Sequence, residues 1–212
     1  MKADGEFNVY GGSLTVDDFL HLNNGASITL GTKDNTWATV TLGTAGTQSE
    51  ENTLKLLNGA NADLYAGTVN VNGTTYIYGS ETKFNANVGN LTFSGEAEFR
   101  NSSVVDLTVS EALAFNESLT IAGNADVSAS GGVITIGAVD HSEAGQILNL
   151  EGTLSVDAEK FDVYGDSRLN GGITATGGSY VFHGDLRTLN STATFGSSDA
   201  YLESFKVEGS EA

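Results

Sequence analysis

Two tyrosines in the segment Thr75-Tyr76-Ile77-Tyr78-Gly79 are the best candidates for contact with a ligand. Alternate residues of an extended strand face opposite sides, so burial of Ile77 turns Tyr76 and Tyr78 outward together. The opposite register would bury two phenols that each need a hydrogen-bond partner. Neighbouring surface rings suit stacking on sugars or packing on a protein. We therefore expect Tyr76 and Tyr78 to be exposed, and they are the candidates for contact with a glycan or protein. Exposure without a role is the simpler interpretation, and burial of both rings is the remaining alternative.

Clustered carboxylates beside a basic residue are a second candidate, because such groups can serve as general acid and base in cleavage of acidic polysaccharides. Glu96 and Glu98 flank Ala97 and should share a solvent face with Arg100. The other set is Asp157, Glu159, Asp162 and Asp166, with Arg168 close to Asp166. No motif typical of a substrate site accompanies them. A solvated acidic surface is the simpler interpretation, and we expect no enzyme activity.

The histidines give no clear site. None of His21, His141 and His183 has the spacing of metal ligands. His183 and Asp185 lie two residues apart and could meet a serine, as in a hydrolytic triad, but no Gly-x-Ser-x-Gly motif is present. The chain has neither an EF-hand loop nor a calcium-binding nonapeptide repeat. We expect no catalytic residue, no metal and no cofactor.

The charge of the chain restricts its partners. The 212 residues include 27 Asp and Glu against nine Lys and Arg, for a formal net charge of −18. Such a chain repels phosphate backbones and anionic lipid surfaces, so we expect no nucleic acid partner. No apolar run approaches eighteen residues, and we expect no membrane insertion by this segment. The anionic exterior favours a monomer.

Short apolar pairs separated by one polar or small residue occur along the whole chain, which is the pattern of brief β-strands. Examples are Leu20/Leu22, Ile28/Leu30, Leu54/Leu56, Val69/Val71, Leu91/Phe93, Ile134/Ile136, Phe161/Val163, Tyr180/Phe182 and Phe205/Val207. Gly, Asn, Asp and Ser, which turn the chain readily, stand between them. The absence of proline fits continuous ladders of backbone hydrogen bonds.

Internal repeats indicate that these strands wind in coils rather than pair in hairpins. Thr174-Ala175-Thr176 returns as Thr192-Ala193-Thr194, eighteen residues later. Asn at the corners can form stacked ladders between coils. We predict an all-β fold, a single-stranded, right-handed parallel β-helix of about ten coils with roughly 18–22 residues each. No linker or composition shift divides the chain, so we assign residues 1–212 to one solenoid domain.

Several stretches resemble the passenger regions of bacterial autotransporters and related β-helical surface adhesins. They share Asn-Gly-Ala corners and acidity, and include Leu22–Gly31, Leu57–Leu64 and Leu119–Val127. The resemblance covers nearly the whole chain and implies a protein that is secreted or displayed on the bacterial cell surface. It also implies that this chain is a segment of a longer secreted protein, since it carries neither the signal nor the membrane β-barrel of that family.

These observations favour a non-catalytic structural or adhesive β-helix, an acidic stalk or passenger segment that contacts a host or cell-surface glycan or protein. One alternative is a carbohydrate-active β-helix, either a polysaccharide lyase or a hydrolase. Another is a surface-layer or fibre subunit, which would polymerise on its own.

Overall fold

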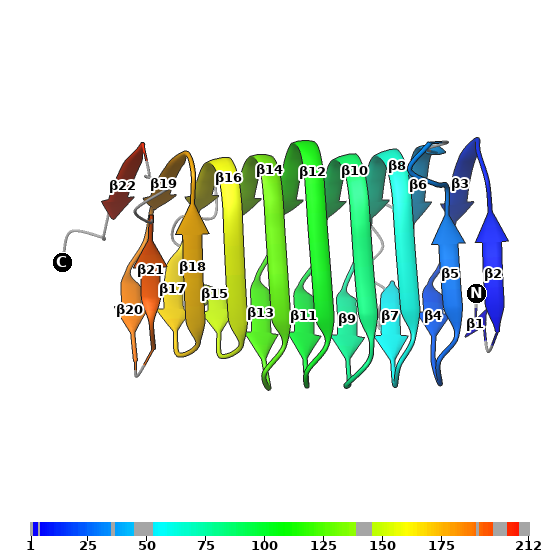
Figure 1. Cartoon of the computed structure of the whole chain (residues 1–212), viewed down its shortest axis with the longest axis horizontal. Helices are drawn as coiled ribbons and strands as arrows, with labels where there is room; N and C mark the ends of the chain where they lie inside the picture. The colour runs from blue at the N-terminus through cyan, green and yellow to red at the C-terminus, as the bar shows by residue number, and fades with distance from the viewer. Residues whose placement is uncertain are drawn as a thin grey trace.

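The chain is a β-solenoid in which short parallel strands stack along one axis (Figure 1). The computed structural model describes residues 2–3, 5–34, 37–44, 53–138, 146–189, 191–196 and 203–207. All regular elements in these ranges are strands, and every strand pair is parallel. The predicted all-β parallel β-helix is therefore confirmed.

Two sheets make up the solenoid, and each holds equivalent strands of successive coils. The nine-stranded sheet contains β1 (Lys2–Ala3), β4 (Leu20–Leu22), β7 (Leu54–Leu57), β9 (Thr75–Tyr78), β11 (Ala97–Arg100), β13 (Leu119–Ala122), β15 (Gln146–Leu150), β17 (Asp166–Leu169) and β20 (Leu186–Thr188). The thirteen-stranded sheet contains β2 (Glu6–Val9), β3 (Ser13–Val16), β5 (Ser27–Leu30), β6 (Trp37–Leu42), β8 (Asn61–Val71), β10 (Lys83–Phe93), β12 (Val104–Phe115), β14 (Asp126–Ile136), β16 (Thr153–Val163), β18 (Gly172–Thr176), β19 (Ser179–Phe182), β21 (Ala193–Phe195) and β22 (Ser204–Val207).

Each long strand of the second sheet turns a corner of the coil. Strands β5 and β6 are separate, yet both pair with β8, one with its first half and one with its second. Glycine allows the bend: a Cβ on Gly131, whose φ is +126°, would overlap the carbonyl oxygen of Val109 in the preceding coil. One coil thus has three straight sides, one in the nine-stranded sheet and two in the thirteen-stranded sheet.

The coils number about eight, close to the predicted ten. Register partners in the nine-stranded sheet lie 19 to 22 residues apart in most coils, as predicted. Two coils are longer, since Leu20 pairs with Leu54 and Leu119 with Leu148. The register inferred from the threonine repeat was wrong, because Thr174 pairs with Thr194 and not with Thr192.

Aromatic side chains fill the middle of the interior. The rings of Phe93 and Phe115, one coil apart in register, stack with centroids 4.9 Å apart and an interplanar angle of 7°. Phe99, from the opposite sheet, meets both rings edge to face. Since all three are at least 98% buried, alternate residues of both sheets build one shared core.

Asparagine shapes equivalent corners of different coils. Asn24, Asn58 and Asn124 adopt positive φ angles of 55°, 53° and 61°, a left-handed conformation that Asn tolerates better than most residues. The Asn58 side-chain amide donates a hydrogen bond of 2.9 Å to Oδ1 of Asn23 in the neighbouring coil. An asparagine contact between coils was predicted, and this pair confirms it.

Candidate functional site

The outer face of β9 carries the two tyrosines singled out from the sequence. Ile77 is fully buried, whereas Tyr76 and Tyr78 point outward and are half-buried. Their rings stack with centroids 5.7 Å apart and an interplanar angle of 17°. The predicted orientation is therefore confirmed. The β-sheet backbone fixes both Cα atoms, and the two stacked rings form a small aromatic platform.

An ion pair borders this platform on the next strand. Strand β11 places Glu98 opposite Tyr76 and Arg100 opposite Tyr78. Arg100 Nε donates a hydrogen bond of 2.9 Å to Glu98 Oε2. Burial raises the pKa of the Tyr76 phenol above its usual value, and the charge of Arg100 opposes this only in part. Tyr76 hence stays neutral and able to donate a hydrogen bond at neutral pH.

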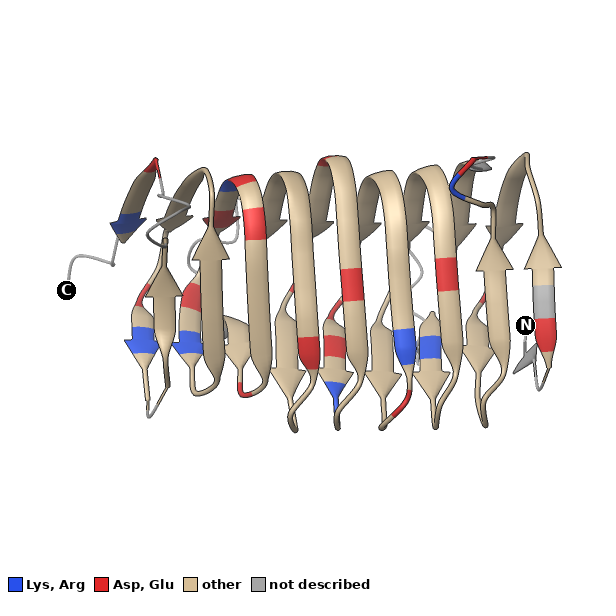
Figure 2. Ribbon diagram, in the orientation of Figure 1, with Lys and Arg blue, Asp and Glu red and all other residues tan. Residues whose placement is uncertain are grey.

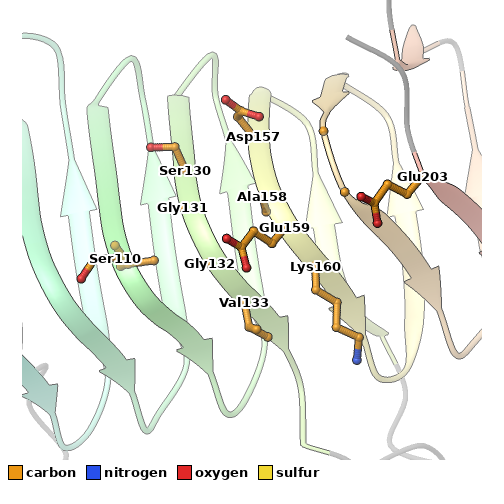
Figure 3. A pocket seen from close by; sticks show the side chains of 13 residues that line it. Ser110, Ser130, Gly131, Gly132, Val133, Asp157, Ala158, Glu159, Lys160 and Glu203 are labelled. Atoms are coloured by element: carbon orange, nitrogen blue, oxygen red, sulfur yellow. The ribbon is translucent and has the colours of Figure 1, made fainter.

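A groove of about 910 Å³ follows the bend of the thirteen-stranded sheet (Figure 3). Its floor is formed by Ser130, Gly131, Gly132 and Val133 of β14, and Asp157, Glu159 and Lys160 project from β16. Glu203 adds a third carboxylate from the C-terminal coil. The groove thus gathers part of the second carboxylate set predicted from the sequence.

The lysine in this groove is held by a carboxylate. Lys160 Nζ lies 2.5 Å from Asp162 Oδ2. This contact raises the Lys160 pKa above its usual value, so the amine stays protonated and does not serve as a base. Asp162 is 3% exposed, and its other oxygen lies 3.6 Å from His183 Nε2. Asp162 is therefore not the solvated surface residue that the sequence suggested.

His183 and Asp185, the pair considered for a hydrolytic triad, contact different residues. His183 stacks on Tyr164, with ring centroids 4.2 Å apart and an interplanar angle of 4°. The carboxylate of Asp185 instead accepts a hydrogen bond of 3.1 Å from Arg187. His141 lies outside the described residues.

Carboxylates Glu96 and Glu98 do not act as an equivalent pair. Glu96 is exposed, whereas Glu98 is half-buried and bound to Arg100. Sequence reasoning missed a different feature, the pairing of Arg168 with Arg187 directly across β17 and β20. The signal was their 19-residue separation, which is one coil length.

Within the described ranges, no group of three or more His, Cys, Asp or Glu side chains is arranged to hold a metal ion. The same part of the chain contains no helix with the length and hydropathy needed to cross a membrane.

The fold and this surface define the protein as a parallel β-solenoid with an aromatic outer patch. The chain matches no protein-family model, and searches of curated proteins and of solved structures found no significant match.

Proposed function

We propose that the chain is a non-catalytic structural or adhesive β-solenoid, a stalk or passenger segment of a protein secreted to the bacterial cell surface. Continuous backbone ladders along the axis make such a rod stiff, and its regular faces display side chains at fixed spacing. The sequence resemblance to autotransporter passengers supports the bacterial surface. The net charge of −18 keeps the rod soluble and monomeric.

The single observation that carries an adhesive role is the outward stacking of Tyr76 and Tyr78. Aromatic rings that stay half-exposed on a rigid strand lose little conformational freedom when a partner covers them. A stacked pair with a neutral phenol and an adjacent ion pair offers both an apolar face and hydrogen-bond donors. These are the groups that recognise a sugar ring on a host or cell-surface glycan.

The test is binding of the fluorescently labelled chain to a glycan array and to cultured host cells. The double variant Tyr76→Ala/Tyr78→Ala should lose at least about tenfold in affinity, the effect of about 1.4 kcal/mol. The matched control is Tyr10→Ala/Tyr65→Ala, which removes two tyrosines that lie outside the nine-stranded sheet. Equal losses in both double variants, or no binding to any glycan or cell, would contradict the adhesive role.

A carbohydrate-active enzyme is the second candidate, because Asp157, Glu159 and Glu203 line one groove. Lyase or hydrolase activity would release unsaturated products or reducing ends from an acidic polysaccharide. Product formation that falls in the variant Asp157→Asn/Glu159→Gln would favour this candidate over the non-catalytic function. Product formation equal to a blank would support the non-catalytic one.

A further inference from the structure

Positive charge is concentrated on one sheet of this strongly acidic protein (Figure 2). Of the eight basic residues whose side chains the structure describes, the strands of the nine-stranded sheet hold four, together with only two acidic residues of the described part. The basic residues are Lys55, Arg100, Arg168 and Arg187, and the acidic ones are Glu98 and Asp166. All three arginines of the chain are in this set. Since fields decay over about 8 Å at physiological salt, a ligand on this sheet meets the local charge more than the net charge.

Two of these arginines lie side by side. Arg168 of β17 and Arg187 of β20 are register partners, so their Cα atoms are about 4.8 Å apart. Both side chains are exposed. Like charges directly opposite on neighbouring strands repel each other and cost stability. An anion bound between the two guanidinium groups would remove this repulsion.

Nearby carboxylates leave this pair incompletely neutralised. Arg187 donates to Asp185, with a distance of 3.1 Å. Asp166 lies two residues before Arg168, but its Oδ1 accepts a hydrogen bond of 3.0 Å from the backbone N–H of Asp185. The guanidinium of Arg168 makes no ion pair within the described part of the chain. Arg168 is hence a cation available to an external anion.

A cavity of about 260 Å³ accompanies the pair. Arg168, Arg187 and Asp166 line it together with Leu189, an apolar side chain that is 46% exposed. Two planar cations beside a small apolar wall fit a carboxylate or sulfate carried on a ring or short chain.

The arginine pair and the tyrosine platform share one face. Strands β11, β13 and β15 separate β9 from β17, which places Tyr76 and Arg168 about 19 Å apart. The register positions between them hold Glu98, Thr120 and Asn149. The charge of Glu98 is paired with Arg100, and the other two side chains are short and uncharged. An extended polymer lying along the solenoid axis can therefore contact both the tyrosine platform and the arginine pair.

We infer that this face, which carries Tyr76, Tyr78, Arg168 and Arg187, binds a linear acidic polysaccharide. A sugar ring stacks on the two tyrosines, and a carboxylate or sulfate of the same chain lies between the two arginines. This inference rests on the proposed adhesive function and specifies its ligand. A glycan fits better than an acidic peptide because the aromatic platform offers a flat stacking surface for sugar rings.

The experiment measures affinity by calorimetry for polygalacturonate, its full methyl ester and polyglutamate. The ester keeps the sugar backbone without charge, and polyglutamate keeps the charge without sugar. Polygalacturonate should bind at least about tenfold more tightly than either. The variant Arg168→Gln/Arg187→Gln should lose this tenfold preference. The matched control Lys33→Gln/Lys83→Gln changes the net charge by the same amount at exposed lysines outside the nine-stranded sheet. Its affinity for polygalacturonate should stay within about twofold of the wild type.

Three results would overturn the inference: equal binding of polygalacturonate and its ester, equal binding of polyglutamate, or equal losses in the two double variants. If the ester or host cells still bind in a manner that depends on Tyr76 and Tyr78, the adhesive function stands and only the acidic ligand is wrong. If no ligand or cell binds in a manner that depends on Tyr76 and Tyr78, both the adhesive function and the acidic ligand are wrong.

Discussion

Truncation of Phe93 should strongly reduce the free energy of unfolding of this solenoid. Its ring stacks on Phe115 and meets Phe84 and Phe99 edge to face, and the side chain is fully buried. Replacing a buried phenylalanine by alanine costs about 3–5 kcal/mol, including the cavity left behind. That cost is a large part of the roughly 5–15 kcal/mol that stabilises a typical domain.

The assay is urea unfolding of Phe93→Ala, followed by far-ultraviolet circular dichroism. Thr92→Ala is the matched control, because Thr92 is the preceding residue of β10 and faces outward. It should change stability by at most about 0.5 kcal/mol. Coupling between Phe93→Ala and Phe115→Ala should be about 0.5–3 kcal/mol, since the two rings touch. A loss below about 1 kcal/mol for Phe93→Ala, or an equal loss for Thr92→Ala, would refute the assigned inward and outward faces.

Two further predictions concern the bend and the buried carboxylate. Gly131→Ala should lower the unfolding temperature strongly, because the new Cβ would overlap the Val109 carbonyl oxygen and the residue has a positive φ. Gly172→Ala is the control, since a Cβ there meets only ordinary contacts and should leave the unfolding temperature nearly unchanged. Equal unfolding temperatures of the two variants would exclude the tight bend at Gly131. The raised pKa of Lys160 means that its ion pair with Asp162 stabilises the fold fully below the ordinary pKa of 10.5 and that this stabilisation is lost as pH rises through the folded-state pKa. The unfolding temperature of Asp162→Asn should therefore differ more from that of the wild type at pH about 9 than at pH about 11.5. A difference that grows with pH would contradict the assigned ion pair.

The orientation of the candidate site could be predicted because it depends on local alternation alone. In β9, the apolar Ile77 between two tyrosines was enough to place both rings outward. The fold class followed from the same alternation along the chain, from glycine and asparagine at the corners and from the internal repeats. Neither conclusion required the exact register between coils.

Alternation does not predict which charged side chains meet between coils, because those contacts depend on register. The pairing of Arg168 with Arg187 requires a coil of 19 residues, whereas the threonine repeat suggested eighteen. Asp162 was expected to be solvated because it lies between the apolar residues Phe161 and Val163, which turns its side chain to the outer face of the strand. Asp162 contacts Lys160 on the same strand and His183, which follows β19, the neighbour of β16 in the next coil. The contact with His183 depends on how β19 pairs with β16.

Equivalent residues of successive coils form straight columns along one axis, and the distances within a column test the fold most directly. The chain lacks cysteine, so pairs of cysteines can be introduced for spin labels at outward positions of one column, with Thr29 as the common site. Ser128 lies four strands from Thr29 and Thr174 lies six, at about 19 Å and 29 Å. Pulsed electron paramagnetic resonance should give distances that rise in this proportion. Distances that do not increase from the first pair to the second would contradict the stacked coils.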